Sequence, residues 1–295
     1  MQTLTAKTII SKYRPHGWFA SNYTMNVYRG CSHGCIYCDS RSLCYSIKDF
    51  DTVKAKENAL IIIEKELKNK HKKGLILSGS MSDPYNPYEA KEKLSQATLK
   101  LIDQYCFGTV IITKSPLVER DIDILLSIKQ HSPAIINFTT TTADDKLCRQ
   151  IEPHVAPTSQ RFKALQNLSS QGLVCGILMM PILPFINDNT QNIEQLVFMA
   201  AASGAKWACM DEGAGMTLRD GNREYFYAAL DKDFVGIKEK YIATFARNYV
   251  CPSPNHHLNQ VFQEACYKHG LLYKPADIDA LILSGYKQAR QLSLL

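Results

Sequence analysis

Short apolar runs alternate along the chain with longer segments in which apolar residues recur every three or four positions. The short runs are rich in β-branched and aromatic residues, which predicts β-strands. Six strands are expected, at residues 25–28, 75–77, 109–113, 134–139, 173–179 and 206–210. Helical spacing lies between them, as in Ile122, Leu125 and Leu126 or in Phe162, Leu165 and Leu168. This alternation predicts repeated right-handed βα units around a parallel sheet, and the periodicity leaves open whether that sheet is flat or curled.

Polar loops follow the predicted strands. They span residues 30–39, 78–87, 114–119, 140–145 and 181–190. In parallel α/β folds, ligands bind at the carboxyl ends of the strands, so these loops are expected to surround one site. From Gly221 onward the alternation of strands and helices stops. The pattern thus divides the chain into a core with its N-terminal segment, residues 1–220, and a mainly helical C-terminal region, residues 221–295.

Composition narrows the class of protein. Of 295 residues, 45% are hydrophobic and 21% are charged, which is typical of a folded globular chain. The net charge of +6 is compatible with nucleic acid or a phosphate-bearing ligand, and equally with an ordinary solvated surface. The first 18 residues lack the apolar core of a signal peptide, and the longest apolar stretch, residues 173–186, is shorter than the roughly 20 residues of a membrane helix. We therefore expect a cytoplasmic protein that contacts no membrane and keeps its ten cysteines reduced.

Three cysteines stand close together in the loop after the first predicted strand. Cys31, Cys35 and Cys38 follow the spacing C-x3-C-x2-C. Thiolates are the usual ligands of iron–sulfur clusters, and three of them would leave one iron of a four-iron cluster open to a small molecule. Gly30 and Gly34 would let the loop wrap closely around such a group.

Two other interpretations of these cysteines stay open. Zinc could take the same thiols with His33 as a fourth ligand, although zinc sites usually pair two C-x2-C elements and the sequence has no second pair. The cysteines could also be ordinary core residues. The place of the motif, directly after a strand of the βα series, favours the iron–sulfur interpretation.

The cysteine motif has an aromatic residue just before its last cysteine and resembles the signature of the radical S-adenosylmethionine (SAM) superfamily. Within the superfamily, the chain looks most like the spore photoproduct lyase-like group. The resemblance rests on the segments at residues 28–38, 80–89, 113–115, 152–153 with Arg161, and 181–188. It implies a partial (β/α)6 barrel of the TIM type with parallel strands, and a 4Fe–4S cluster on Cys31, Cys35 and Cys38.

The same resemblance implies the chemistry. SAM would bind the open iron, with Tyr37 against its adenine. The reduced cluster would cleave SAM and yield a 5′-deoxyadenosyl radical. A reductant protein such as a flavodoxin or ferredoxin would supply the electron.

The resemblance also assigns residues to the methionyl end of SAM. Ser80, Ser82 and Asp83 lie in the loop where the superfamily binds the amino group, and their oxygens suit that donor. The residues alone suit equally well a turn in which Asp83 caps the next helix. Lys114, at the end of the third strand, would pair with the carboxylate, and Ser115 lies beside it in the same segment.

Three further positions are expected near the ligand. Arg161 would hold the carboxylate or a ribose hydroxyl, or else form a surface ion pair with Glu152. Thr140, in a run of hydroxyls at the end of the fourth strand, would face the methionyl group or the ribose, although β-propensity explains part of this run. Ile182 would make an apolar contact with adenine.

One position departs from the group that the chain resembles. Spore photoproduct lyases split a thymine dimer and use a cysteine hydrogen donor in the loop after the second strand, where this chain has Ser80. The O–H bond of a hydroxyl is much stronger than the S–H bond of a thiol, so Ser80 cannot readily quench a substrate radical. Three functions stay open: a radical SAM enzyme with an unknown substrate, a lyase that repairs or modifies DNA or RNA, and a non-catalytic metal-binding module.

Overall fold

The computed structural model describes residues 1–13 and 18–292, and a seven-stranded sheet of order β10-β9-β8-β7-β6-β3-β2 lies at their centre. Its strands are β2 (Ile10–Lys12), β3 (Tyr23–Met25), β6 (Leu75–Ser78), β7 (Gly108–Thr113), β8 (Ala134–Thr139), β9 (Val174–Leu178) and β10 (Trp207–Cys209). All neighbouring strands from β3 to β10 run parallel, and β2 at the edge runs antiparallel to β3. The prediction of an α/β protein with a mainly parallel sheet is confirmed.

Five of the six predicted strands lie in this sheet within one residue of their expected bounds, and the first differs. The prediction placed it at residues 25–28, whereas β3 ends at Met25 and Tyr28 begins another strand. Both residues are buried, so the apolar run does not show where the chain leaves one sheet for the next. The second sheet has the order β1-β5-β4 and consists of β1 (Gln2–Leu4), β5 (Lys54–Lys56) and β4 (Tyr28–Arg29).

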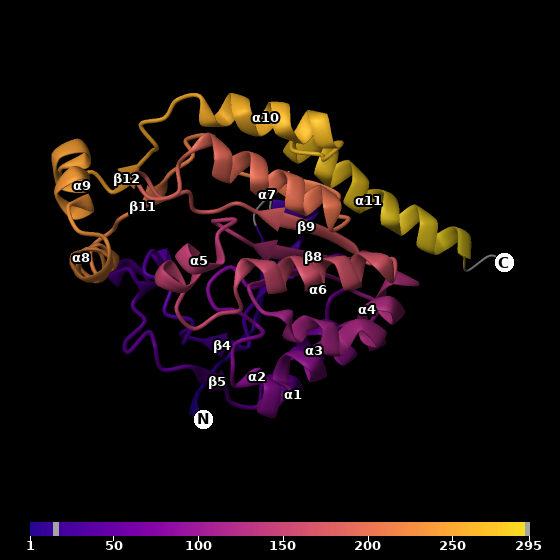
Figure 1. Cartoon of the computed structure of the whole chain (residues 1–295). Coiled ribbons are helices and arrows are strands. Elements are labelled where there is room, and N and C mark those ends of the chain that lie inside the picture. The colour runs from indigo at the N-terminus through magenta and orange to yellow at the C-terminus, as the bar shows by residue number, and fades with distance from the viewer. Residues whose placement is uncertain (14–17, 293–295) are drawn as a thin grey trace.

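Helices cover one face of the central sheet (Figure 1). They are α1 (Ala59–Lys68), α3 (Leu94–Gln104), α4 (Ile122–Lys129), α6 (Thr158–Ser170) and α7 (Thr190–Ala202). Two shorter helices, α2 (Glu89–Glu92) and α5 (Asp145–Ile151), precede α3 and α6 in the chain. The apolar series that predicted helices fall in α4 and α6, where Leu125, Leu165 and Leu168 are fully buried. Because the parallel strands alternate with these helices, the loops that leave the carboxyl ends of the strands gather at one edge of the sheet.

The other face of the sheet packs on segments from near the two ends of the chain. A 3-10 turn, η1 (Trp18–Ala20), contacts the last helix, α11 (Pro275–Leu292). The Phe19 ring stacks on Trp207 with centroids 6.1 Å apart, and Ile282 of α11 belongs to the same apolar cluster. The core therefore lies on both sides of the sheet, with helices on one side and these two segments on the other.

The described residues of the predicted C-terminal region, 221–292, lie on two separate parts of the molecule (Figure 1). One part packs beside the cysteine motif and consists of α8 (Asn222–Asp233), α9 (Ile237–Phe245) and β12 (Val250–Cys251), which pairs with β11 (Met216–Thr217) of the preceding segment. The other part begins with α10 (Leu258–His269), which packs along α7 and leads into α11. The boundary at residue 220 stays a prediction, and it falls in the connection between β11 and α8.

Short 3-10 turns complete the described chain. They are η2 (Asp39–Arg41), η3 (Leu43–Tyr45) and η4 (Pro116–Asp121). The first two directly follow the cysteine motif, and the third follows β7. Across the described ranges, each helix is either too short or too polar to cross a membrane.

Candidate functional site

The cysteine loop leaves β4 at Gly30 and bends again at Gly34. Gly30 has φ +80°, and a Cβ there would lie 2.6 Å from the carbonyl oxygen of Phe50. Gly34 has φ +69°, and a Cβ there would lie 2.9 Å from the ring of His154. A side chain at either position would combine backbone strain with a steric clash. The fold therefore requires both glycines that the sequence singled out.

Backbone hydrogen bonds fix this loop to the connection between α5 and α6. The Ile36 N–H donates to the carbonyl of Ile151 at the end of α5 (3.0 Å). In the opposite direction, the His154 N–H donates to the carbonyl of His33 (3.1 Å). The cysteine loop is thus held by a segment more than one hundred residues away in the sequence.

All ten cysteines are free thiols, and in the motif Cys31 and Cys35 are buried while Cys38 is partly buried. Burial raises the pKa of Cys31 to about 12 and also raises the pKa of Cys35 and Cys38, although Lys114 acts in the opposite direction on the latter two. A metal would bind these groups as thiolates and displace their protons. Over residues 1–13 and 18–292, no three His, Cys, Asp or Glu side chains converge closely enough to hold one metal ion. The assignment of the three cysteines as ligands stays a prediction.

Behind the loop, Tyr37 joins a buried network on α5 and α6. Its hydroxyl donates to Glu152, and the same carboxylate pairs with the guanidinium of Arg161. Arg161 also donates to the carbonyls of Thr139 (2.8 Å) and Ala156 (2.8 Å). Burial alone would raise the pKa of Glu152, but the guanidinium and a nearby lysine ammonium outweigh it and hold this pKa below its ordinary value. The carboxylate therefore stays charged in the core.

The expectation of a surface ion pair between Arg161 and Glu152 is wrong in its location. The pair forms, but both side chains are 0% exposed. Arg161 also donates to the sulfur of Cys148 (3.4 Å), so most of its N–H groups already have partners within the protein. A direct contact of Arg161 with SAM stays a prediction, while the geometry gives it a role in holding Tyr37 through Glu152.

Asp83 ties together three of the loops at the edge of the sheet. Its carboxylate accepts hydrogen bonds from the Tyr85 N–H (2.8 Å), the Thr113 hydroxyl (2.7 Å) and the Lys114 N–H (2.8 Å). Nδ1 of His33, in the cysteine loop, lies 3.6 Å from the same carboxylate. The turn interpretation thus accounts for the contact with Tyr85. Its other part is wrong: Asp83 does not cap the next helix, because α2 begins at Glu89 and has no side-chain cap. The remaining contacts leave the carboxylate few free positions for the amino group of a ligand.

The three predicted serines lie in different surroundings. Ser82 is buried and donates to the carbonyl of Gly30 (2.5 Å), so it supports the cysteine loop. Ser115 accepts a hydrogen bond from the Leu117 N–H (3.3 Å) and caps η4. Ser80 is exposed in the loop after β6. Of the three, Ser80 is the serine that faces solvent.

Lys114 extends toward the cysteine loop from the end of β7. Its Nζ lies 5.9 Å from the centroid of the Tyr37 ring. In the part of the chain that the structure describes, no carboxylate comes within 4.0 Å of this ammonium. Burial acts to lower the pKa of Lys114, but Cys35 and Glu152 outweigh it and raise this pKa. The side chain is therefore an unpaired cation, which suits an anionic group such as a carboxylate.

Two hydroxyls at the end of β8 are buried without a partner. Within the described chain, Oγ1 of Thr140 and Oγ1 of Thr141 make no hydrogen bond. The Thr141 carbonyl accepts a hydrogen bond from Asn187 (2.8 Å), which ties the segment after β9 to this strand end. Ile182 is buried in that same segment. Buried polar groups without partners are costly, so they are typical of a site that a ligand completes.

The groups at this edge fit the cofactors that the sequence implied. Cys31, Cys35 and Cys38 offer thiol ligands for iron, Lys114 offers a cation for a carboxylate, and Thr140 offers an unpaired hydroxyl. The other predicted polar residues mainly hold the loops that carry these groups. The predicted set therefore divides into residues open to a ligand and residues that position them.

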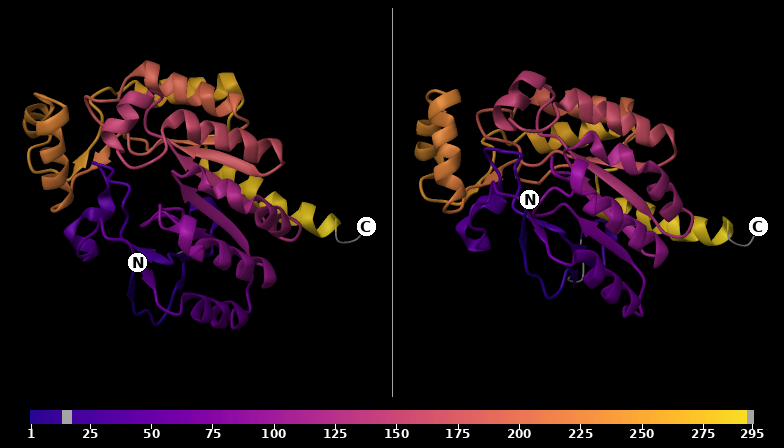
Figure 2. Two further views of the ribbon diagram at one scale, coloured as in Figure 1. Left: turned by 60° about the horizontal axis from the view of Figure 1, so that its bottom comes forward. Right: turned by 90° about the horizontal axis from the view of Figure 1, so that it is seen from below.

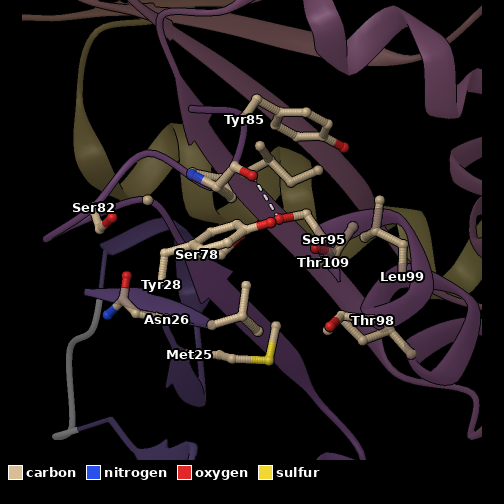
Figure 3. Close-up of a pocket in the computed structure, with 15 residues that line it drawn as sticks. Met25, Asn26, Tyr28, Ser78, Ser82, Tyr85, Ser95, Thr98, Leu99 and Thr109 are labelled. Carbon is tan, nitrogen blue, oxygen red and sulfur yellow. Dashed lines mark hydrogen bonds between the residues drawn. The ribbon is translucent and has the colours of Figure 1, made fainter. Parts of the chain in front are cut away.

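Sequence reasoning missed a buried network beside the cysteine loop. Tyr28 donates to the buried carboxylate of Glu89 (2.5 Å), and Arg120 pairs with both Glu89 (2.7 Å) and Asp121 (2.8 Å). Asp121 in turn accepts a hydrogen bond from Tyr85 (3.0 Å). Figure 3 shows Tyr28 and Tyr85 at a small cavity of about 20 Å³, which has room for one water. The proline-rich segment with Tyr85 and Glu89 was the available signal, but no local pattern indicates that Glu89 is buried.

Comparisons with known proteins cover the same part of the chain. Residues 25–197 match the family model described as the Radical SAM superfamily. An uncharacterized protein of Mycobacterium tuberculosis (strain ATCC 25618 / H37Rv) is 27% identical over 239 residues, which are 78% of this chain and 69% of the relative. An uncharacterized protein of Methanocaldococcus jannaschii is 35% identical over 171 residues, which are 57% of this chain and 63% of the relative.

Solved structures of spore photoproduct lyase share the fold. A single-residue mutant of that enzyme matches with a TM-score of 0.65 and 12% identity, over 91% of this chain and 80% of that one. The enzyme complexed with dinucleoside spore photoproduct matches with a TM-score of 0.64 and 11% identity over the same shares. At this identity the likeness shows the fold alone.

The family model spans more than half of the chain and includes the cysteine loop and the carboxyl ends of the strands from β3 to β9. Members of this family use a 4Fe–4S cluster and SAM, which are the cofactors that the groups described above fit. The chain therefore belongs to the radical SAM superfamily.

Proposed function

We propose that this protein is an enzyme that holds a 4Fe–4S cluster on Cys31, Cys35 and Cys38 and cleaves SAM to begin radical chemistry on a substrate. The observation that carries the proposal is the cysteine loop, bent at Gly30 and Gly34, within the region that the family model matches. The parallel strands from β3 to β10 support a partial (β/α)6 barrel with this loop at its mouth.

Four side chains would contact SAM in this proposal. When bound and reduced, the cluster supplies the electron that splits the sulfonium of SAM into methionine and a 5′-deoxyadenosyl radical. The ammonium of Lys114 pairs with the methionyl carboxylate, because it has a free charge beside the cysteine loop. Thr140 gives its unpaired hydroxyl to the ligand, and Tyr37 and Ile182 flank the adenine.

The other residues of the site act through their neighbours. Ser82 supports the cysteine loop at Gly30, and Asp83 fixes the backbone of Lys114. Arg161 holds Tyr37 through the shared carboxylate of Glu152. Such support keeps ligand-binding groups within the small tolerance that a cofactor site needs.

The proposal leaves the substrate open and does not extend to the cleavage of a thymine photoproduct. By the resemblance, the exposed Ser80 stands where such chemistry would need a thiol. A nucleic-acid substrate would be recognised by binding that weakens steeply with salt. A flavodoxin or ferredoxin is the class of reductant that we propose, and the ten free thiols support a location in the reducing cytoplasm.

Anaerobic reconstitution with iron and sulfide tests the proposal directly. The purified protein is loaded, reduced with dithionite and mixed with SAM, and the products are separated by liquid chromatography with mass detection. We expect a brown protein that forms 5′-deoxyadenosine and methionine. A colourless protein with one zinc per chain would contradict the proposal.

Matched cysteine variants test the ligand assignment. Cys35→Ala removes a buried thiol of the motif, and Cys106→Ser removes an exposed thiol outside it. The first variant should lose both the cluster absorbance and the products, and the second should keep both. If Cys35→Ala still forms 5′-deoxyadenosine, the assignment of Cys35 is wrong.

A further inference from the structure

The residue that follows the third cysteine is bound to the segment at and after β11. The carboxylate of Asp39 accepts hydrogen bonds from Ser42 (3.2 Å) and Tyr45 (2.8 Å) within its own loop. It also accepts one from the Thr217 hydroxyl (2.9 Å) and one from the Arg219 guanidinium (2.5 Å). Two of its four donors therefore come from a segment about 180 residues away.

Neighbouring contacts extend this attachment. The Leu43 N–H donates to the carbonyl of Asp220 (2.9 Å). The guanidinium of Arg41 stacks on the ring of Tyr225, 3.6 Å from its centroid. Gly221 has φ +87°, and a Cβ there would lie 3.0 Å from Leu43 Cγ. The turns η2 and η3 are thus packed closely against residues 216–225, which we call the clasp.

Apolar packing joins the clasp to the cysteine motif itself. Cys35 and Tyr37 belong to the same buried cluster as Met216 and Leu218 of the clasp and Phe226 of α8. Figure 2 shows α8 and α9 beside the N-terminal loops, away from the helices that cover the sheet. The cysteine loop therefore contacts both the clasp and the α5–α6 connection.

We propose that the clasp positions the cysteine loop for the cluster and that Arg219 is its main positioning residue, acting through Asp39 on Cys38. The inference rests on the proposed function, because the loop is taken to be the cluster site. A hydrogen bond between charged groups is stronger than one between neutral groups. Of the two clasp donors to Asp39, the cation Arg219 therefore holds the carboxylate more strongly than the hydroxyl of Thr217.

Site-resolved alkylation of the metal-free protein tests the clasp without any cofactor. Reduced protein is treated with iodoacetamide, and the labelling rate of Cys38 is measured by mass spectrometry against the partly exposed Cys209 as an internal reference. In Arg219→Ala, Cys38 should react up to roughly fivefold faster, because loss of this partly exposed ion pair makes local opening easier by at most about that factor. Arg219→Lys keeps a charged donor and should restore most of the protection. The control Lys238→Ala breaks an exposed ion pair between α9 and α8 and should change nothing.

The loaded protein gives a second readout. We expect the electron paramagnetic resonance spectrum of the reduced cluster to change in Arg219→Ala and to stay like wild type in Lys238→Ala. If Arg219→Ala unfolds, Thr217→Val takes its place, with an expected increase of about threefold in the Cys38 rate. Unchanged Cys38 rates and spectra in the folded clasp variants would overturn the inference. A wild-type protein that takes up no cluster would instead overturn the proposed function, while the alkylation still decides whether the clasp holds the loop.

Discussion

Neutralising Glu152 should destabilise the protein strongly, because it leaves Arg161 as an unpaired charge in the core. Both side chains are 0% exposed. Glu152→Gln keeps the shape of the side chain and an oxygen for the Tyr37 hydroxyl, but it removes the negative charge. Removing one partner of a buried pair costs roughly 3–5 kcal/mol. Because two carbonyls still accept hydrogen bonds from the guanidinium, we expect a loss at the lower end, about 3 kcal/mol.

Equilibrium unfolding in urea measures this loss on the reduced, metal-free protein. With a slope of about 3 kcal/mol per molar urea, a loss of about 3 kcal/mol lowers the midpoint by about 1 M. The matched control is Asp231→Asn, which breaks the exposed pair with Lys238, whose side chains are 52% and 31% exposed. That change should cost less than about 1 kcal/mol. The double variant Glu152→Gln/Arg161→Met should regain most of the stability, because it removes both charges of the pair.

Equal urea midpoints for Glu152→Gln and Asp231→Asn would refute this reasoning. The pH dependence gives an independent check. The pKa of Glu152 is lowered in the folded protein, so its contribution is complete above the unfolded pKa of about 4.3 and is lost as the pH falls through the lower folded value. The difference in stability between wild type and Glu152→Gln should therefore persist at pH 7 and shrink only in acid.

Three further predictions concern single positions. Lys114→Met should raise the dissociation constant for SAM about tenfold or more in equilibrium dialysis, because it removes the cation proposed for the carboxylate. The absorbance of the cluster should not change. An unchanged dissociation constant would argue against that role. Thr140→Val should leave the melting temperature of the metal-free protein unchanged or higher, because the lost hydroxyl has no described partner; a clear decrease would show that the hydroxyl is paired. Gly30→Ala should lower the free energy of unfolding by about 2 kcal/mol more than Gly236→Ala. The angle φ is nearly equal at the two positions, but of the two only Gly30 has described atoms within 4 Å of a new Cβ. Equal losses would contradict the clash with Phe50.

The local pattern of the chain determined the sheet and the cysteine loop. Five strands were located within one residue, because the carboxyl-end loops and the helices between them interrupt each apolar run. Gly30 and Gly34 could also be identified from the sequence, because a positive φ in a tight loop depends on the residue itself and its near neighbours. The first strand was misplaced because its apolar run crosses from one sheet to another.

The tertiary structure decided which polar residues are open to a ligand. Asp83 and Arg161 suit a cofactor by their chemistry, yet their oxygens and N–H groups are mostly used within the protein. A short stretch of sequence cannot show which of these groups are already bonded, because their partners lie far apart in the chain. Tyr37 and Glu152 are 115 residues apart, and Asp39 and Arg219 are 180 residues apart.

Contacts between distant residues also decide where the two halves of the C-terminal region lie. The halves share a helical pattern but pack on different parts of the molecule. The periodicity of the sequence indicates which face of a helix or strand is apolar, but only the folded chain determines which residues that face packs against.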